Sequence, residues 1–132
     1  MPEYLSPGVY IQEPVGGARP IRGVANERRL LSYLEKSIQE GTQWVVFETN
    51  GPQLWARMKA TVVDFLLDPW RAGLLKGAKA EEAFFVRCDQ STMNQDDIDS
   101  GRLVCLVGAA LMRPAEFVVF RIVQWTADAK GS

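Results

Sequence analysis

The segment from Phe117 to Trp125 is strongly apolar: seven of its nine side chains are hydrophobic. Val, Ile, Phe and Trp all favour β-strands. Apolar side chains fall on both faces of such a strand, which is typical of a strand covered on both sides. Two interpretations follow. The segment is either a central strand of the chain's own sheet or a strand donated to a neighbouring copy.

Apolar residues at helical spacing predict two amphipathic helices. The first begins after Asn26, a favourable N-cap residue, and runs to about Glu40. The second begins near Gln53. We expect it to end near Leu67, because Pro69 lacks an N–H donor and clashes with the preceding turn.

Short apolar segments predict the remaining strands. In chain order these are Val9–Ile11, Trp44–Phe47, Glu81–Asp89 and Leu103–Met112. Phe84, Val86 and Cys88 alternate, so they share one face of the third strand. The pattern predicts an α+β fold with two main helices packed on a small mixed sheet.

An acidic segment, Gln95–Asp99, predicts a short turn of helix that Asn94 or Thr92 opens and Gly101 ends. It is part of the chain's only cluster of aspartates, at positions 89, 96, 97 and 99. The cluster does not match a calcium loop, because counting from Asp97 places glycines at the fifth and twelfth positions. We therefore expect neither a metal nor a cofactor here.

The chain divides into an extended arm (1–25), a core domain (26–116) and a C-terminal strand with a polar tail (117–132). Prolines and glycines at positions 14, 16, 17 and 20 exclude regular structure from much of the arm. The arm is either a disordered tail or a segment that becomes ordered by adding Val9–Ile11 to the edge of another sheet.

Composition argues for an ordinary globular domain. The 132 residues are 47% apolar and 23% charged, and the net charge of −1 favours neither nucleic acid nor a membrane as a partner. The two cysteines, Cys88 and Cys105, are expected to be free, buried thiols in a reducing compartment.

The absence of histidine argues against an enzyme, because it removes the commonest general base and metal ligand. The remaining catalytic alternative is a small hydrolase built from the carboxylates of Glu48, Glu82 and Asp89, with Lys76 or Lys79. The spacing of these residues does not favour it. Arg121 is the one charge inside the final apolar strand, and if buried it needs a carboxylate partner.

The N-terminal residues 1–13 (MPEYLSPGVYIQE) resemble the start of contractile tail sheath proteins of phages and related injection machines. Further blocks resemble the C-terminal domain of the same family, in order, at 28–31, 44–48, 54–55, 81–89, 96–103 and 113–120. Together they cover nearly the whole chain. Family members usually carry outer domains between these two regions, whereas here residues 23–25 run directly into 26–29.

The resemblance implies a structural subunit and not an enzyme. Family sheaths form six-fold helical layers around an inner tube, and their terminal arms insert into sheets of neighbouring C-terminal domains. The N-terminal donated strand would then contain Val9, Tyr10 and Ile11. The C-terminal donated strand would contain Phe117, Val119, Phe120, Ile122 and Trp125. The receiving strands would contain Phe84, Val86, Cys88, Leu103, Cys105 and Val107.

The expected partners are further copies of the chain, an inner tail tube and baseplate proteins, in a phage tail or in the bacterial cytoplasm during assembly. We interpret the acidic turn, with Gln95, Asp96, Asp97 and Asp99, as the contact for the tube. The alternative is a monomeric capping or adaptor module whose arms dock on a full-length sheath or baseplate.

Overall fold

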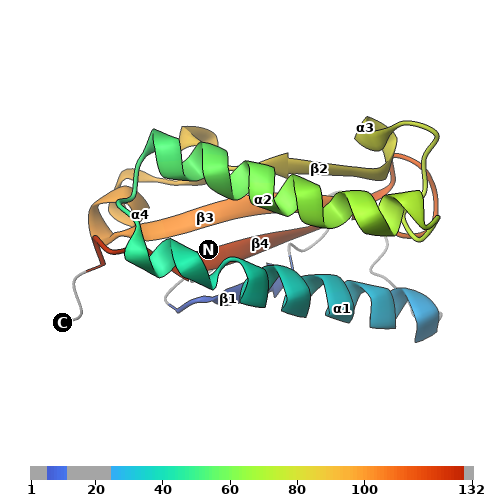
Figure 1. The fold of residues 1–132 in the computed structure, drawn as a ribbon, viewed down its shortest axis with the longest axis horizontal. Helices are drawn as coiled ribbons and strands as arrows, with labels where there is room; N and C mark the ends of the chain where they lie inside the picture. The colour runs from blue at the N-terminus through green and yellow to red at the C-terminus, as the bar shows by residue number, and fades with distance from the viewer. Residues whose placement is uncertain (1–5, 12–24, 130–132) are drawn as a thin grey trace.

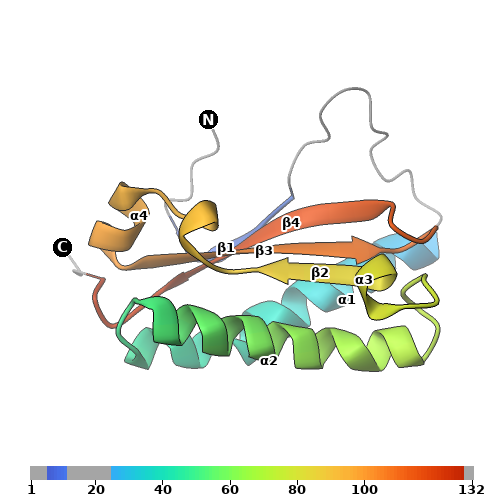
Figure 2. The ribbon, with the colours of Figure 1, turned by 90° about the horizontal axis from the view of Figure 1, so that it is seen from above.

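The computed structural model describes residues 6–11 and 25–129, excepting the side chains of residues 25 and 26. These segments have the α+β fold expected: two long helices cover one face of a four-stranded sheet (Figures 1 and 2). The elements in chain order are β1 (Gly8–Ile11), α1 (Ala25–Gly41), η1 (Gln43–Phe47), α2 (Pro52–Arg71), α3 (Ala80–Ala83), β2 (Phe84–Arg87), η2 (Gln90–Thr92), α4 (Gln95–Ser100), β3 (Arg102–Ala110) and β4 (Phe117–Trp125).

The described strands lie in the order β1-β4-β3-β2, and every pairing between them is antiparallel. The expectation of a mixed sheet was therefore wrong. Only residues 111–116 separate β3 from β4. A connection this short joins antiparallel strands, whereas parallel strands need a crossover of about a dozen residues or more.

The core lies between the sheet and the two long helices. Phe84 of β2 packs edge-on against Trp70 of α2, with ring centroids 6.5 Å apart, so this side of β2 faces the helices. The β3 side chains on the same face are fully buried: Leu103, Cys105, Val107 and Ala109. Gln124 of β4 also reaches the helical layer, and its amide nitrogen donates to the hydroxyl of Thr42 at 3.0 Å.

Helix α2 continues through Pro69 to Arg71, so the end expected near Leu67 was wrong. Proline at this position removes only the amide that would bond to the Phe65 carbonyl, near the end of the helix. Pro69 is buried, and the indole N–H of Trp70 donates to the Gly77 carbonyl at 2.9 Å. Burial and this hydrogen bond offset the one that the proline removes.

The expected strand at Trp44–Phe47 was also wrong, because these residues belong to the 3-10 helix η1. Its backbone is satisfied locally: the amide of Val45 donates to the Thr42 carbonyl at 3.2 Å, and that of Glu48 to the Val45 carbonyl at 3.0 Å. Val45 is fully buried, whereas Phe47 is 82% exposed. A short apolar run alone does not distinguish a strand from a connecting turn.

Strand β2 is shorter than the segment expected at 81–89, because its first residues form α3. The Glu82 carboxylate accepts hydrogen bonds from the amides of Ala78 and Lys79, at 2.9 and 3.3 Å. Such capping stabilises a helical start and competes with strand formation. Phe84 and Val86 share one face of β2 as predicted, and Cys88 lies just beyond the end of the strand; all three are buried.

Glu35 on α1 makes the stability of the fold depend on pH. Burial raises the pKa of Glu35 above its ordinary value of 4.5. A carboxyl with a raised folded-state pKa destabilises the fold when ionised, so its penalty is absent below the unfolded pKa and grows as pH rises through the folded pKa. We expect Glu35→Gln to melt at a higher temperature than the parent at neutral pH, and at the same temperature near pH ~3.5.

Thermal melts at the two pH values, followed by circular dichroism, check this expectation. Glu40→Gln, at an exposed position of the same helix, separates the effect of burial from the loss of a charge. If Glu35→Gln raised the melting temperature equally at both pH values, the raised pKa assigned to Glu35 would be wrong.

Candidate assembly interface

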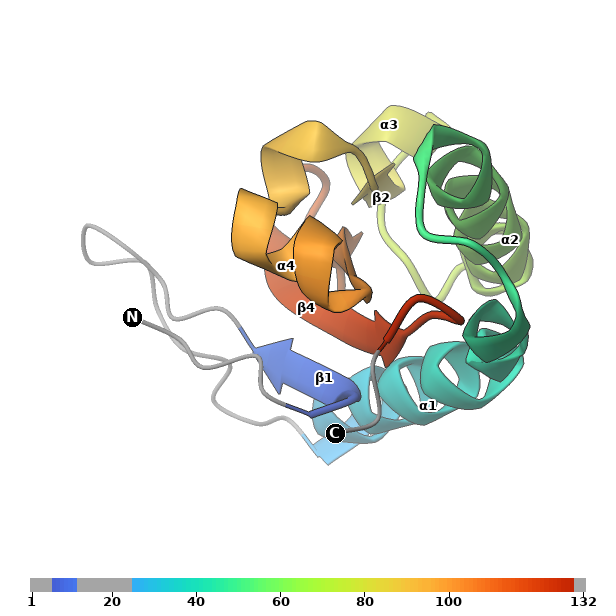
Figure 3. The same cartoon turned by 90° about the vertical axis from the view of Figure 1, so that its left-hand side faces the viewer.

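Strand β1 forms one edge of the sheet and pairs with β4 (Figure 3). The register places Val9 opposite Ile122. Val9 and Tyr10 are partly buried and pack against the core, whereas Ile11 at the end of the strand is 48% exposed. This short segment therefore gives the sheet both backbone pairing and apolar contact.

Strand β4 lies inside the sheet, between β1 and β3. Its pairing with β3 extends over the whole strand, from Phe117 opposite Ala110 to Trp125 opposite Arg102. Phe120 and Ile122 are fully buried. Within the single chain, β4 is therefore a central strand of the sheet. The two terminal segments predicted to be exchanged lie side by side.

The sheet face turned away from the helices carries aromatic contacts across strands. Phe85 of β2 meets Phe117 of β4 edge to face, with ring centroids 5.1 Å apart and an interplanar angle of 87°. Gly108 of β3 lies opposite Phe85 in the ladder. A Cβ atom at Gly108 would lie only 2.0 Å from the Phe85 ring, so glycine is required for this close approach.

Arg121 lies on the same face, opposite Tyr10 of β1 and Leu106 of β3, and is half-buried. At the far end of β4, the guanidinium of Arg102 lies 5.5 Å from the ring centroid of Trp125. Arginine over an aromatic face is a favourable cation–π arrangement.

Residues after β4 are anchored to the rest of the domain. The amide and hydroxyl of Thr126 both donate to the Gly101 carbonyl, at 2.8 and 2.9 Å. The backbone amide of Ala127 donates to the Glu48 carbonyl at 2.9 Å, and the Asp128 carboxylate accepts from the backbone amide of Asn50 at 3.0 Å. The sequence pattern suggested only a polar tail here, because these partners are distant in the chain.

The acidic turn is α4, and its predicted limits are confirmed. Asn94 is the N-cap and accepts from the Asp97 amide at 2.7 Å, while Gly101 ends the helix in the left-handed conformation at φ 79°. Asp97 itself is buried and accepts from the Arg102 guanidinium at 2.9 Å. The other members of the predicted contact, Gln95, Asp96 and Asp99, are exposed.

The model of one protein family, the phage tail sheath C-terminal domain, matches residues 24–124. The chain belongs to this family. The match begins at the residue before α1 and ends within β4, so it includes both long helices and the three strands β2, β3 and β4.

Two solved structures are similar to this sheath domain. A chain of the 6-fold symmetrised cryo-EM structure of the anti-feeding prophage (AFP) baseplate is 42% identical, with 69% of this chain and 26% of that chain covered and a TM-score of 0.62. A chain of the PVC sheath complex of an extracellular contractile injection system, in the contracted state, is 36% identical, with 85% and 32% covered and a TM-score of 0.62. The sheath domain thus spans about a quarter to a third of those chains. No curated protein matches it.

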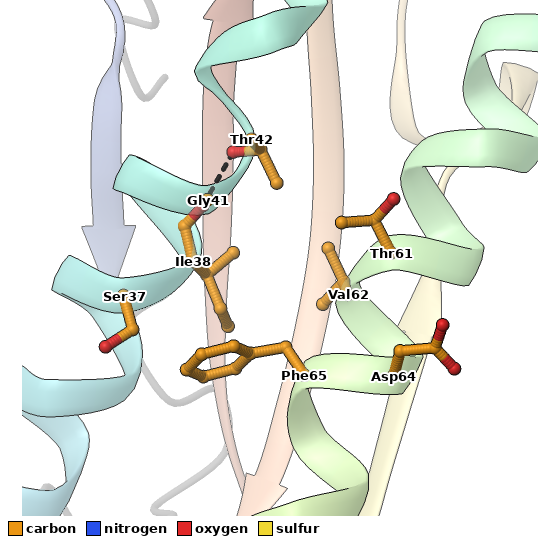
Figure 4. A pocket seen from close by; sticks show the side chains of 8 residues that line it. All are labelled: Ser37, Ile38, Gly41, Thr42, Thr61, Val62, Asp64 and Phe65. Atoms are coloured by element: carbon orange, nitrogen blue, oxygen red, sulfur yellow. Dashed lines mark hydrogen bonds between the residues drawn. The ribbon is translucent and has the colours of Figure 1, made fainter.

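The sheath domain has an open hollow of about 290 Å³ between α1 and α2 (Figure 4). Ile38, Val62 and Phe65 point into it, and Asp64 points away. Its remaining lining residues are Ser37, Gly41, Thr42 and Thr61.

The carboxylates of the hydrolase alternative hold local structure in the sheath domain. Glu82 caps α3, and Glu48 pairs with Arg57. Asp89 caps η2, and hydrogen bonds from Ser91 lower the pKa of this carboxyl. The element α3 and the α1–α2 connection, which carry Glu82 and Glu48, lie at opposite ends of the molecule (Figure 1).

Within residues 6–11 and 25–129 of the sheath domain, no cluster of three or more His, Cys, Asp or Glu side chains is placed to hold a metal ion. None of the described helices is long and apolar enough to cross a membrane.

Proposed function

We propose that this chain is a structural subunit of a contractile injection machine and that copies assemble by exchanging β1. The observation that carries the proposal is the position of β1: it is a separate edge strand, and residues 12–24 connect it to α1. A connection of this length spans at most roughly 45 Å, compared with the roughly 30 Å diameter of a small domain. The β1 strand of one copy can therefore reach the β4 edge of a neighbour.

Exchange would preserve the contacts seen within one chain. The neighbour's Val9 would lie opposite Ile122 and its Ile11 opposite Phe120, as in the present register. Each exchanged strand would then link two subunits without loss of backbone pairing. Repetition along a polymer makes many weak links strong.

Exchange of β4 is a second, more demanding step of the proposal. Residues 111–116 reach at most roughly 20 Å, so donating Phe117–Trp125 requires the β3–β4 hairpin to open. We therefore assign the first intersubunit link to β1, with β4 of the neighbour as the receiving strand.

The assembly proposed is a six-fold ring or tube that surrounds an inner tube and contacts a baseplate. The 6-fold baseplate and the sheath complex among the similar structures support this arrangement. The exposed side of α4, with Gln95, Asp96 and Asp99, would face a basic surface of the tube. The subunit would have a structural role and no catalytic one.

A chain that lacks residues 1–11 tests the role of β1. We expect it to remain folded, with a cooperative melt, and to stay monomeric in light scattering, whereas the parent forms rings or tubes in negative-stain images. The reason is that the parent can offer its β1 to a neighbour and the shortened chain cannot. Tubes formed by the shortened chain would contradict the proposal.

A synthetic peptide of residues 1–13 provides the matched control. It should bind the shortened chain one to one and, added in excess to the parent, should limit polymer length by occupying the β4 edge. A peptide with Val9→Asp should do neither, because Val9 packs against the core.

A monomeric capping module is the second candidate, favoured by the observation that β1 and β4 already pair within one chain. A light-scattering mass equal to one subunit at high concentration, together with binding to a full-length sheath or baseplate, would favour that function.

A further inference from the structure

The two cysteines of the chain face each other across the β2–β3 pair. The register places Val86 opposite Val107 and Arg87 opposite Leu106, where β2 ends; continued by one residue, it would bring Cys88 opposite Cys105. Both thiols are free and buried, with 6% and 0% of the residues exposed. The Cys88 thiol donates to the Val104 carbonyl at 3.9 Å, and its interaction with the neighbouring Cys105 thiol, followed by burial, raises the pKa of Cys88.

This placement suits a covalent bond between the sulfurs. Directly opposed residues of antiparallel strands have Cα atoms about 4.5–5.5 Å apart. Disulfides occur at Cα separations of about 4.4–6.8 Å. Cys105 shares the helix-facing side of β3 with Val107, and Cys88 comes two residues after Val86, so a strand continued through Cys88 would direct both Cβ atoms to the same side of the sheet.

We propose that Cys88 and Cys105 are a modification site: they form an intrachain disulfide when the protein meets an oxidising medium that contains a low-molecular-weight disulfide such as oxidised glutathione. The bond would join the two ends of the segment 89–104, which carries η2 and α4. It would therefore brace the base of the acidic turn and tie the edge strand β2 to β3. This inference does not depend on the proposed exchange of β1.

The reaction is ordinary thiol–disulfide exchange. One cysteine attacks the small disulfide as its thiolate, forming a mixed disulfide and releasing one small thiol. The second cysteine attacks the protein sulfur of that mixed disulfide, which forms the Cys88–Cys105 bond and releases the second small thiol. Two electrons pass from the protein to the small disulfide, and the two protons end on the released thiols.

The local environment makes the reaction slow while the sheet is closed. Burial leaves little access for a reagent, and the raised pKa of Cys88 keeps that thiol protonated at neutral pH. Oxidation then requires β2 to open briefly. This is feasible because β2 is a short strand at the sheet edge, paired on one side only among the described strands.

The test is the equilibrium between dithiol and disulfide in buffers of reduced and oxidised glutathione, measured by acid quenching and mass spectrometry. We expect the effective concentration of the two thiols to be about 100-fold higher in the folded chain than in concentrated urea, because the fold holds the sulfurs together. Tryptic peptides of the oxidised protein should contain the 88–105 link. Equal effective concentrations in the folded and unfolded chains would overturn the proposal.

A matched control moves one thiol along the same face. The double variant Cys105→Val, Val107→Cys retains the composition of the strand but places the thiols diagonally, at a Cα separation of about 7–8 Å that a disulfide does not span. In this variant the effective concentration of the two thiols should be no higher in the folded chain than in urea, while its circular dichroism spectrum stays that of the parent. A control that oxidises as readily as the parent would show that facing register is not the cause, and would also overturn the proposal.

Discussion

Replacing Phe120 with alanine is expected to destabilise the domain by about 3–5 kcal/mol. Phe120 is fully buried in β4, opposite Ile11 of β1 and Val107 of β3. The substitution removes a large apolar side chain and leaves a cavity that the surrounding strands and helices fill only partly. Because the free energy of unfolding of native proteins is only about 5–15 kcal/mol, the variant should lose much of its stability. Urea denaturation followed by circular dichroism measures the loss.

The same substitution at Phe47 is the control. Phe47 is 82% exposed on η1, so Phe47→Ala should change the free energy of unfolding by no more than about 0.5 kcal/mol. If the two variants lost equal stability, the burial assigned to β4 would be wrong.

Replacing Gly108 with alanine is expected to destabilise the domain by about 1–3 kcal/mol, a large effect for one added methyl group. A Cβ atom at Gly108 would lie 2.0 Å from the Phe85 ring, so the ring must move and its edge-to-face contact with Phe117 must break. Urea denaturation measures this loss as well.

A double variant separates overpacking from any other cause. Gly108→Ala should be nearly neutral in a Phe85→Ala background, because the ring that it meets is gone. Gly41→Ala is the matched control on α1: no atom lies within 4 Å of the added Cβ, and alanine favours a helix over glycine. If Gly108→Ala lowered the free energy of unfolding equally in both backgrounds, the Phe85 ring would not be the obstacle.

Elements with strong periodicity were predictable from the sequence. The first helix, the start of the second, the acidic turn between Asn94 and Gly101, and the strands at 102–110 and 117–125 lie close to where the pattern places them. Cap residues and alternation act over a few neighbouring positions, so sequence alone contains the relevant information. The resemblance to tail sheath proteins is confirmed by the family match.

The errors arose where distant contacts outweigh local preference. Pro69 stays in α2 because it and Trp70 are buried against other elements, and Glu82 holds a helical turn where a strand was expected. The role of Gly108 was not visible either, because it depends on the Phe85 ring; for Gly101 the sequence showed the helix end but not the close approach of the residues after β4.

The sequence by itself determined that this is an α+β domain with two amphipathic helices, a strongly apolar final strand and no histidine-based chemistry. Only the tertiary structure decided that β1 lies beside β4, that the sheet is antiparallel throughout the described strands, and that Cys88 is a neighbour of Cys105. The physical reason is that periodicity specifies which face of a helix or strand is apolar. Which strand lies beside another depends on backbone pairing and packing between residues far apart in the chain.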